Sequence, residues 1–222
     1  MTAAAQVCAA IRQALAAAAE PGRASGQQAY MKSAMPFLGV RVPQVRNLTK
    51  RTLTGIDDPL LLRAAALTLW RQAEYREERY AAAAITGLRP LRARLDLMDV
   101  HEEMIRTGAW WDHTDEVAKR VGATLAAHPG LGPQILGWAR SSDMWIRRAA
   151  IISQLGFRER TDLILLTGVI EPNLADREFF IRKAIGWALR DFARVEPAWV
   201  QQYVDGHDLS PLSAREALKH LG

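Results

Sequence analysis

The stretch REFFIRKAIGWALRDFAR, residues 177–194, decides the fold class of this chain. Its apolar residues follow one another at steps of four, three and four positions, which places them on one face of an α-helix: Ile181, Ile185, Ala188 and Phe192. Apolar residues recur at helical spacing along almost the whole sequence, whereas the alternating β-branched runs typical of strands do not occur. The sequence therefore predicts an all-α protein.

Residues that begin helices agree with this periodicity. Asp143, Asp176 and Ser210 each precede a helical run and can cap its first turn. We expect a dozen or so helices, at roughly residues 2–19, 26–34, 43–54, 58–72, 75–87, 93–107, 110–127, 131–140, 143–157, 161–170, 177–194, 197–205 and 211–221.

The helix starts also recur at a regular step. Starts at Tyr75, Trp110, Asp143 and Arg177 are separated by about 34 residues, the period of stacked helical hairpins. Each expected unit is a longer, often charged helix followed by a shorter one, so stacked units form a curved solenoid with the longer helices along one side. No linker rich in Pro, Gly or Ser divides the chain. We expect one domain over residues 1–222, an α-α superhelix with a concave groove.

The composition is that of a folded, moderately basic protein. It has 49% hydrophobic and 24% charged residues and a net charge of +5, which is compatible with nucleic acid, an anionic membrane surface or an acidic partner. Cys8 is the only cysteine, which excludes an intramolecular disulfide and a thiolate metal cage and fits a reducing cytoplasm. The Ala-rich start carries Arg12 and Gln13 within its apolar run, so it predicts an amphipathic helix rather than a signal peptide.

Motifs for metal or nucleotide chemistry do not occur in the sequence. The five histidines are scattered without paired spacing, and neither a glycine-rich phosphate loop nor a GxSxG motif occurs. No apolar run has the length of a membrane span. We expect no metal, no cofactor and no membrane partner.

The first candidate site opens the helix expected at residues 110–127. Trp111 and Asp115 are four residues apart, so their side chains lie one above the other on one helix face. Acidic residues in a first turn offset the helix dipole, and this structural role is the simpler explanation of Asp112. An aromatic face beside a carboxylate can stabilise a developing cation, and we assign that role to Trp111 and Asp115.

A second candidate is a basic stripe on the helix at residues 177–194, opposite the apolar face. Its members follow at steps of four, three and four: Lys183, Trp187, Arg190 and Arg194. A stripe of this kind can also be a solvated helix face with a half-buried tryptophan.

The third cluster pairs Trp145 with Arg148 on one face of the helix expected at 143–157. The arginine can form an exposed salt bridge or hold a phosphate with two hydrogen bonds. Because the three clusters open or line successive long helices, a solenoid would bring them onto one concave wall. Basic residues interleaved with aromatics on a curved surface favour binding of a nucleic-acid backbone.

Several stretches, in this order over nearly the whole chain, resemble the AlkD family of bacterial DNA alkylation-repair glycosylases. They are Tyr30-Met31-Lys32 with Pro36-Phe37-Leu38-Gly39; Trp110-Trp111-Asp112 with Asp115; Trp145 with Arg148, Ala149 and Ala150; Glu178 to Arg190; and LSPLSAREALKH, residues 209–220. The last two stretches are the most distinctive.

The resemblance implies a HEAT-like repeat solenoid that holds duplex DNA in a basic concave groove. It also implies hydrolysis of the N-glycosidic bond of alkylated purines, of the 3-methyladenine and 7-methylguanine type, without a metal. The resemblance assigns the catalytic role to Asp115, with Trp111 and Trp187 packed on the sugar and backbone beside it. The expected DNA contacts are Arg148, on a phosphate, with Tyr30, Lys183, Arg190 and Trp110.

These residue types suit that reaction. An alkylated purine is cationic and already a good leaving group, so it needs little help from a general acid. As the bond breaks, positive charge moves to the deoxyribose, where Asp115 would stabilise it and position or deprotonate a water. Lysine Schiff-base chemistry is not expected, because the pattern places no lysine beside Asp115.

Two other functions compete with this one. The first is a non-catalytic helical-repeat protein that recognises damaged or structured DNA; some members of the family bind DNA without the aromatic–acid set, which this chain retains. The second is a helical scaffold for an acidic peptide, which would have no affinity for duplex DNA at low salt. For the glycosylase we expect a cytoplasmic, bacterial monomer acting on double-stranded DNA that contains alkylated bases.

Overall fold

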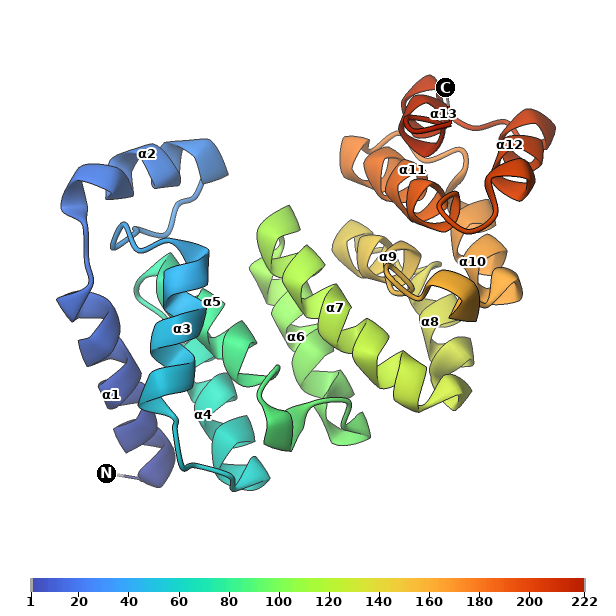
Figure 1. Ribbon diagram of the computed structural model, residues 1–222. Coiled ribbons are helices and arrows are strands. Elements are labelled where there is room, and N and C mark those ends of the chain that lie inside the picture. The colour runs from blue at the N-terminus through green and yellow to red at the C-terminus, as the bar shows by residue number, and fades with distance from the viewer. Residues whose placement is uncertain (1, 222) are drawn as a thin grey trace. The chain divides into compact units, whose positions relative to one another are not determined.

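The computed structural model describes residues 2–221, and all regular structure within that range is helical (Figure 1). Thirteen α-helices and five short 3-10 turns follow one another without a strand between residues 2 and 221. The all-α prediction is confirmed. The chain divides into two compact units, one ending at Val100 and the other beginning at His101, and each is described by itself. The predicted single domain and its concave groove stay predictions.

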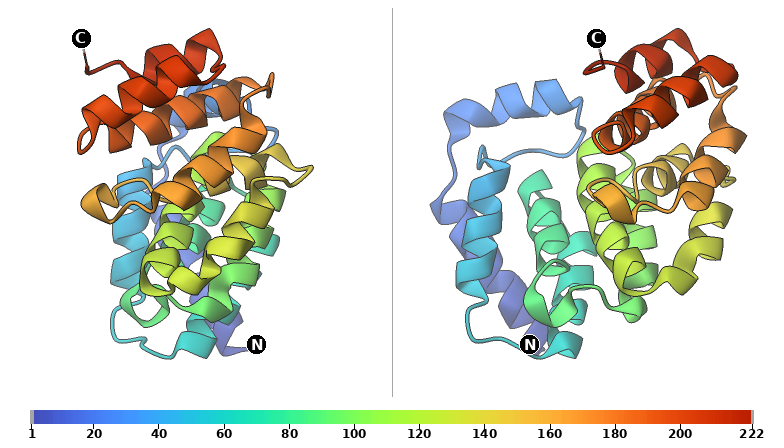
Figure 2. Two further views of the ribbon diagram at one scale, coloured as in Figure 1. Left: turned by 90° about the vertical axis from the view of Figure 1, so that its right-hand side faces the viewer. Right: turned by 45° about the vertical axis from the view of Figure 1, so that its right-hand side comes forward.

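The first unit contains α1 to α5 and the beginning of α6. The bounds are α1 (Ala3–Ala17), α2 (Pro21–Met31), α3 (Val42–Thr52), α4 (Pro59–Arg71), α5 (Arg76–Ile85), the 3-10 turns Arg89–Leu91 and Leu95–Leu97, and α6 (Met98–Gly108). Helices α1, α3, α4 and α5 pack together, and their apolar faces form a core with Ile11, Leu15, Leu62, Leu69 and Ile85 fully buried. By contrast, α2 buries no residue and lies across one end of these helices (Figure 2).

A buried carboxylate fixes the turn that joins α2 to α3. Glu77 of α5 is fully buried and accepts hydrogen bonds from the backbone N–H groups of Leu38, Gly39 and Val40 at 3.0, 2.9 and 3.1 Å. Gly39 has φ +88, and a Cβ there would lie 2.1 Å from the carbonyl oxygen of Glu20. The PFLG stretch is therefore a turn that only glycine can complete, held by an acid some forty residues later in the chain.

The second unit contains the rest of α6 and the helices α7 to α13. The bounds are α7 (Trp111–Ala127), α8 (Gly132–Trp138), α9 (Met144–Ile151), α10 (Leu163–Ile170), α11 (Phe179–Phe192), α12 (Pro197–Gly206) and α13 (Pro211–Ala217), with 3-10 turns at Pro129–Leu131, Arg158–Arg160 and Glu171–Asn173. Helices α7, α9 and α11 contact one another in sequence, and α8 and α10 pack against α9 and against each other. Successive hairpins therefore stack as repeats, which confirms the helical-repeat architecture.

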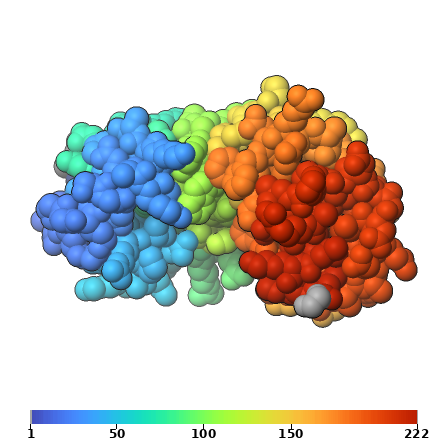
Figure 3. All heavy atoms as spheres, turned by 90° about the horizontal axis from the view of Figure 1, so that it is seen from above, coloured from blue at the N-terminus to red at the C-terminus, as the bar shows by residue number. Residues whose placement is uncertain are grey.

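The C-terminal helices close one end of the second unit. Helix α13 packs along α11 and touches α12, and in the space-filling view of Figure 3 the two last helices form a continuous surface. The N-caps Tyr75, Trp110, Asp143 and Glu178 lie within one residue of the predicted repeat starts.

Several predicted helix bounds and lengths were wrong. The helix expected at 26–34 runs from Pro21 to Met31, because proline is favoured at a first helical position and Lys32 then turns into the left-handed region. The helix expected at 143–157 ends at Ile151, ahead of Gly156 with φ +83. The 3-10 turn Leu95–Leu97 replaces the beginning of the helix expected at 93–107, and α6 begins at Met98. Helices α9 and α10 both have 8 residues, so the predicted alternation of long and short helices fails in that hairpin.

Candidate active site

The side chain of Asp115 lies on the second turn of α7 and is held by an arginine from the next repeat. The Nε and Nη2 atoms of Arg148, on α9, donate to its two carboxylate oxygens at 2.7 and 2.8 Å. This is the parallel, two-bond geometry that guanidinium and carboxylate groups prefer. The carboxylate therefore has one orientation, and each of its oxygens keeps a second lone pair for another donor.

The Arg148 guanidinium has a third partner in the following repeat. Its Nη1 donates to the carbonyl oxygen of Phe180 at 2.6 Å, and its central carbon lies 5.9 Å from the centre of the Phe180 ring. The side chain is only 6% exposed, because it points from α9 into the stack, where a charge requires a counter-ion. We expected this guanidinium to hold a phosphate or to form an exposed salt bridge. The structure shows a buried salt bridge with Asp115 instead of an exposed one, and the contact with a phosphate stays a prediction.

Burial raises the pKa of the Asp115 carboxyl above its ordinary value, even though the hydrogen bonds and the charge of Arg148 oppose the shift. The charge of Lys119, one helical turn further on, also lowers this pKa, and that of Asp112 raises it. We expected no lysine beside Asp115; Lys119 lies four residues further along α7, and its ammonium group is paired with Glu116 at 3.7 Å. The carboxylate side chain remains 15% exposed, so one edge of it is open to solvent or a ligand.

Three aromatic rings form a cluster next to this ion pair. The ring centres of Trp110, Trp145 and Phe180 lie between 5.1 and 6.0 Å apart in tilted and edge-on contacts. Phe179 extends the cluster, with its centre 5.3 Å from that of Phe180 and more than half of its surface exposed. Trp110, expected to contact DNA, thus packs mainly on protein; the role of Phe180 was missed, because only the packing of α9 on α11 brings it to Arg148.

The two predicted tryptophans beside Asp115 occupy different helices of the same unit. Trp111 is the first residue of α7, and Trp187 lies in the middle of α11; both are half-buried. Tyr30 lies on α2 of the first unit and is 74% exposed, so its side chain is available to a ligand. The DNA-binding and catalytic roles of these three residues stay predictions.

The basic stripe of α11 is paired with an acid that the sequence analysis did not single out. Lys183 Nζ lies 2.8 Å from one oxygen of Glu216, and Arg190 Nη1 lies 2.7 Å from the other. Both cations hold the pKa of the Glu216 carboxyl below its usual range, with the Lys183 hydrogen bond as the largest cause. Glu216 belongs to α13, so no spacing within residues 177–194 could have revealed it.

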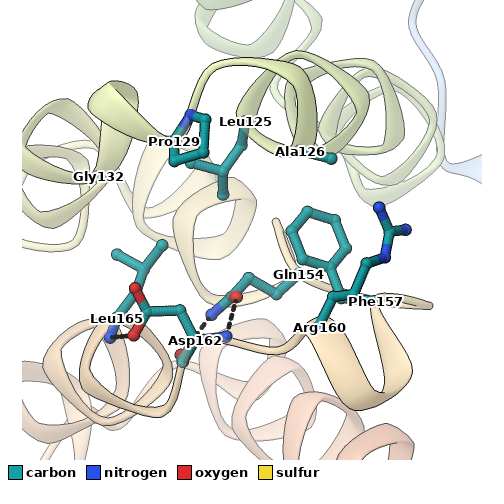
Figure 4. Close-up of a pocket in the computed structure, with 9 residues that line it drawn as sticks. All are labelled: Leu125, Ala126, Pro129, Gly132, Gln154, Phe157, Arg160, Asp162 and Leu165. Carbon is teal, nitrogen blue, oxygen red and sulfur yellow. Dashed lines mark hydrogen bonds between the residues drawn. The ribbon is translucent and has the colours of Figure 1, made fainter.

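A pocket of about 230 Å³ lies at the other end of α7, and Figure 4 shows its lining. Leu125 of this pocket is ten residues beyond Asp115, about 15 Å along the helix, so the pocket is not part of the aromatic–acid site. Gln154 and Asp162 close one side through two hydrogen bonds, at 2.8 and 2.9 Å. Among residues 2–221, no group of three or more His, Cys, Asp or Glu side chains could hold a metal ion.

The fold and this site define a helical-repeat protein in which a buried arginine orients a carboxylate among aromatic side chains. The model of the family described as DNA alkylation repair enzyme matches residues 11–221. The chain therefore belongs to the DNA alkylation repair enzyme family, with a role in DNA alkylation repair, and the resemblance to AlkD proteins is confirmed. None of the described helices is both long enough and apolar enough to cross a membrane.

Solved structures share this fold. A predicted DNA alkylation repair enzyme from Enterococcus faecalis is 30% identical with a TM-score of 0.84, and the match covers 92% of this chain and 97% of that one. AlkD2 from Streptococcus mutans is 18% identical with a TM-score of 0.63, covering 81% of this chain and 88% of its own. The smu.31 protein from Streptococcus mutans UA159 is 19% identical with a TM-score of 0.64, covering 81% and 92%. No curated protein matches this chain in sequence.

Proposed function

We propose that this protein is a monofunctional DNA glycosylase that hydrolyses the N-glycosidic bond of alkylated purines in duplex DNA. The observation that carries the proposal is the Asp115 carboxylate, oriented by Arg148 and one helical turn from the indole of Trp111. The family's role in DNA alkylation repair supports it. A cationic lesion such as 3-methyladenine or 7-methylguanine fits a site that supplies negative charge and aromatic faces.

In the proposed reaction the bond between C1′ and the purine nitrogen breaks first. Its electron pair leaves with the base, which becomes neutral, and the deoxyribose takes on oxocarbenium character. The Asp115 carboxylate stabilises that positive charge and accepts a proton from the water that attacks C1′. Arg148 fixes the direction of the carboxylate, so the charge is in place before the bond breaks.

The tryptophans would surround the sugar. A π face stabilises a nearby positive charge, and Trp111 and Trp187 expose part of their rings. Neither a metal nor a lysine adduct is required by this route, because the leaving group is already activated by alkylation.

Replacing Asp115 with asparagine tests the proposal. The amide keeps the shape but removes the negative charge, so we expect release of 7-methylguanine from methylated duplex to slow by at least roughly tenfold, while duplex affinity is retained. The measurement is single-turnover base release, with Asp112→Asn as the control, since Asp112 lies in the preceding turn of the same helix and its carboxylate accepts from the backbone N–H of His113. Equal rates for wild type and D115N would refute the assignment of Asp115.

The same assay separates the competing functions. Duplex binding without any base release by the wild-type protein would identify a non-catalytic DNA-binding protein. The absence of duplex binding at low salt would instead favour the scaffold for an acidic peptide.

A further inference from the structure

The carboxylate of Glu216 lies between two cations that belong to another helix. Each of its oxygens takes one partner, Lys183 Nζ at 2.8 Å and Arg190 Nη1 at 2.7 Å. A phosphodiester presents two charged oxygens in a similar way, and lysine and arginine are its usual protein partners. The acid therefore occupies the place that a backbone phosphate would take on this pair.

Glu216 is fixed in this position by the packing of α13 on α11. A Cβ at Gly186 would lie 2.5 Å from the Glu216 Cβ and 2.8 Å from the Ser213 carbonyl oxygen, so the two helices touch there. The Ser213 hydroxyl donates to the carbonyl oxygen of Arg182 at 3.0 Å. The Glu216 side chain is only 13% exposed. It is part of a helix contact and not a mobile surface acid.

The two cations, in contrast, remain reachable. Lys183 keeps 37% of its side chain exposed and Arg190 keeps 21%, and both stand one turn or less from Trp187 on α11. A phosphate that approaches this face meets a group with a net charge of only +1, because one carboxylate already offsets one of the two cations.

We propose that Lys183 and Arg190 form a phosphate-binding site and that Glu216 occupies it in the unbound protein, which weakens sequence-independent binding to the DNA backbone. This inference rests on the proposed function, because it specifies how the same face holds DNA. A DNA-repair protein must leave undamaged duplex quickly to reach rare lesions, and a built-in competitor shortens each non-specific encounter. Glu216 thus lowers the affinity for the backbone of any duplex, so that contacts made only at a lesion account for a larger share of the binding free energy.

The variant Glu216→Gln tests this directly. It keeps the size of the side chain and frees both cations, so we expect tighter binding to undamaged duplex at low salt and a steeper salt dependence. One more phosphate contact makes affinity fall about threefold further between 50 and 200 mM salt. The matched control is Glu196→Gln, because Glu196 is exposed at the N-cap of α12, makes no side-chain capping bond, and undergoes the same change in charge.

Two further variants make the result specific to this site. Glu216→Asp retains the charge but draws the carboxylate back by one methylene, and we expect its affinity to fall between those of wild type and E216Q. In a Lys183→Met, Arg190→Met background the E216Q substitution should have no further effect on duplex binding. Circular dichroism and thermal melting establish that each variant is folded before its affinity is compared.

Equal affinity and equal salt dependence for E216Q and E196Q would overturn the inference, as would weaker binding by E216Q than by wild type, since Glu216 would then orient the cations rather than compete for them. The proposed function is judged separately, by base release from methylated duplex by the wild-type protein. If the wild-type protein releases base and E216Q binds duplex as wild type does, only this inference is contradicted. If the wild-type protein binds duplex but releases no base, only the proposed reaction is contradicted.

Discussion

At the scale of single residues, the orientation of the Asp115 carboxylate depends on its hydrogen bonds with Arg148. A surface ion pair contributes little to stability, but the guanidinium here is almost completely buried and all three of its nitrogens have partners. The sequence predicted that Trp111 and Asp115 share a helix face, since that follows from four-residue spacing. It could not predict that Arg148 turns inward, because the choice between phosphate, solvent and Asp115 depends on how α7, α9 and α11 pack.

Replacing Arg148 with methionine should both destabilise the protein and change its pH dependence. Breaking a buried pair from one side costs about 3–5 kcal/mol. Arg106, which is exposed and pairs with Glu102 and with Asp143, provides the control, since R106M should cost less than about 1 kcal/mol. Urea unfolding of the two variants measures the difference, and equal losses would contradict a special role for the buried pair.

The pH dependence follows from the direction of the Asp115 pKa. The proposed reaction needs the ionised carboxylate, so base release should fall as the pH drops through this raised pKa. Arg148 lowers the pKa, and its removal therefore raises it further. The acidic limb of the rate profile should move to higher pH in R148M and back towards wild type in R148K. An unmoved limb would show that another group controls the profile.

At the scale of helices, the beginnings of elements were easier to predict than their ends or their neighbours. N-caps and first-turn prolines are local signals. The starts at Tyr75, Trp110, Asp143 and Arg177 were found from the recurrence of helical runs, and they lie within one residue of the observed N-caps. Helix α9 ends at Ile151 although apolar spacing continues beyond it, because the chain must turn back towards α10. The acid that pairs with the basic stripe comes from α13, and periodicity within one helix carries no information about such a partner.

The contact between α11 and α13 should be sensitive to a single methyl group. In Gly186→Ala the new Cβ meets Ser213 and Glu216 at distances shorter than carbon and oxygen atoms tolerate, so α13 must shift, at a cost of about 1–3 kcal/mol. Gly137→Ala, within α8 and with open space around it, is the control and should be neutral or slightly stabilising. Thermal melting compares the two, and a G186A protein as stable as G137A would contradict the tight contact.

At the scale of the whole molecule, the net charge of +5 does not show which cations are already paired with carboxylates. Lys183, Arg190 and Arg148 all have carboxylate partners, so the bulk charge alone is a poor guide to DNA affinity. The fold class and the family could be predicted from the sequence, because helical spacing and the distinctive stretches are spread over the whole chain.

Salt dependence is the whole-molecule measurement that follows. If phosphate contacts dominate, the logarithm of the wild-type duplex affinity falls linearly with the logarithm of salt concentration, by about 0.9 per phosphate neutralised. Titration of a fluorescent undamaged duplex at several salt concentrations gives that slope. A flat line would contradict binding through the DNA backbone.

Arg148 also joins three successive repeats, since it sits on α9, holds Asp115 of α7 and donates to the carbonyl oxygen of Phe180 at the start of α11. A local opening that frees this side chain removes a hydrogen-bonded contact with both neighbouring helices at once. Amide protons of α7, α9 and α11 are therefore expected to exchange with solvent as one cooperative unit rather than repeat by repeat. A repeat protein can usually unfold locally from its ends. Here the guanidinium of Arg148 both orients the proposed catalytic carboxylate and links the helices that are expected to unfold together.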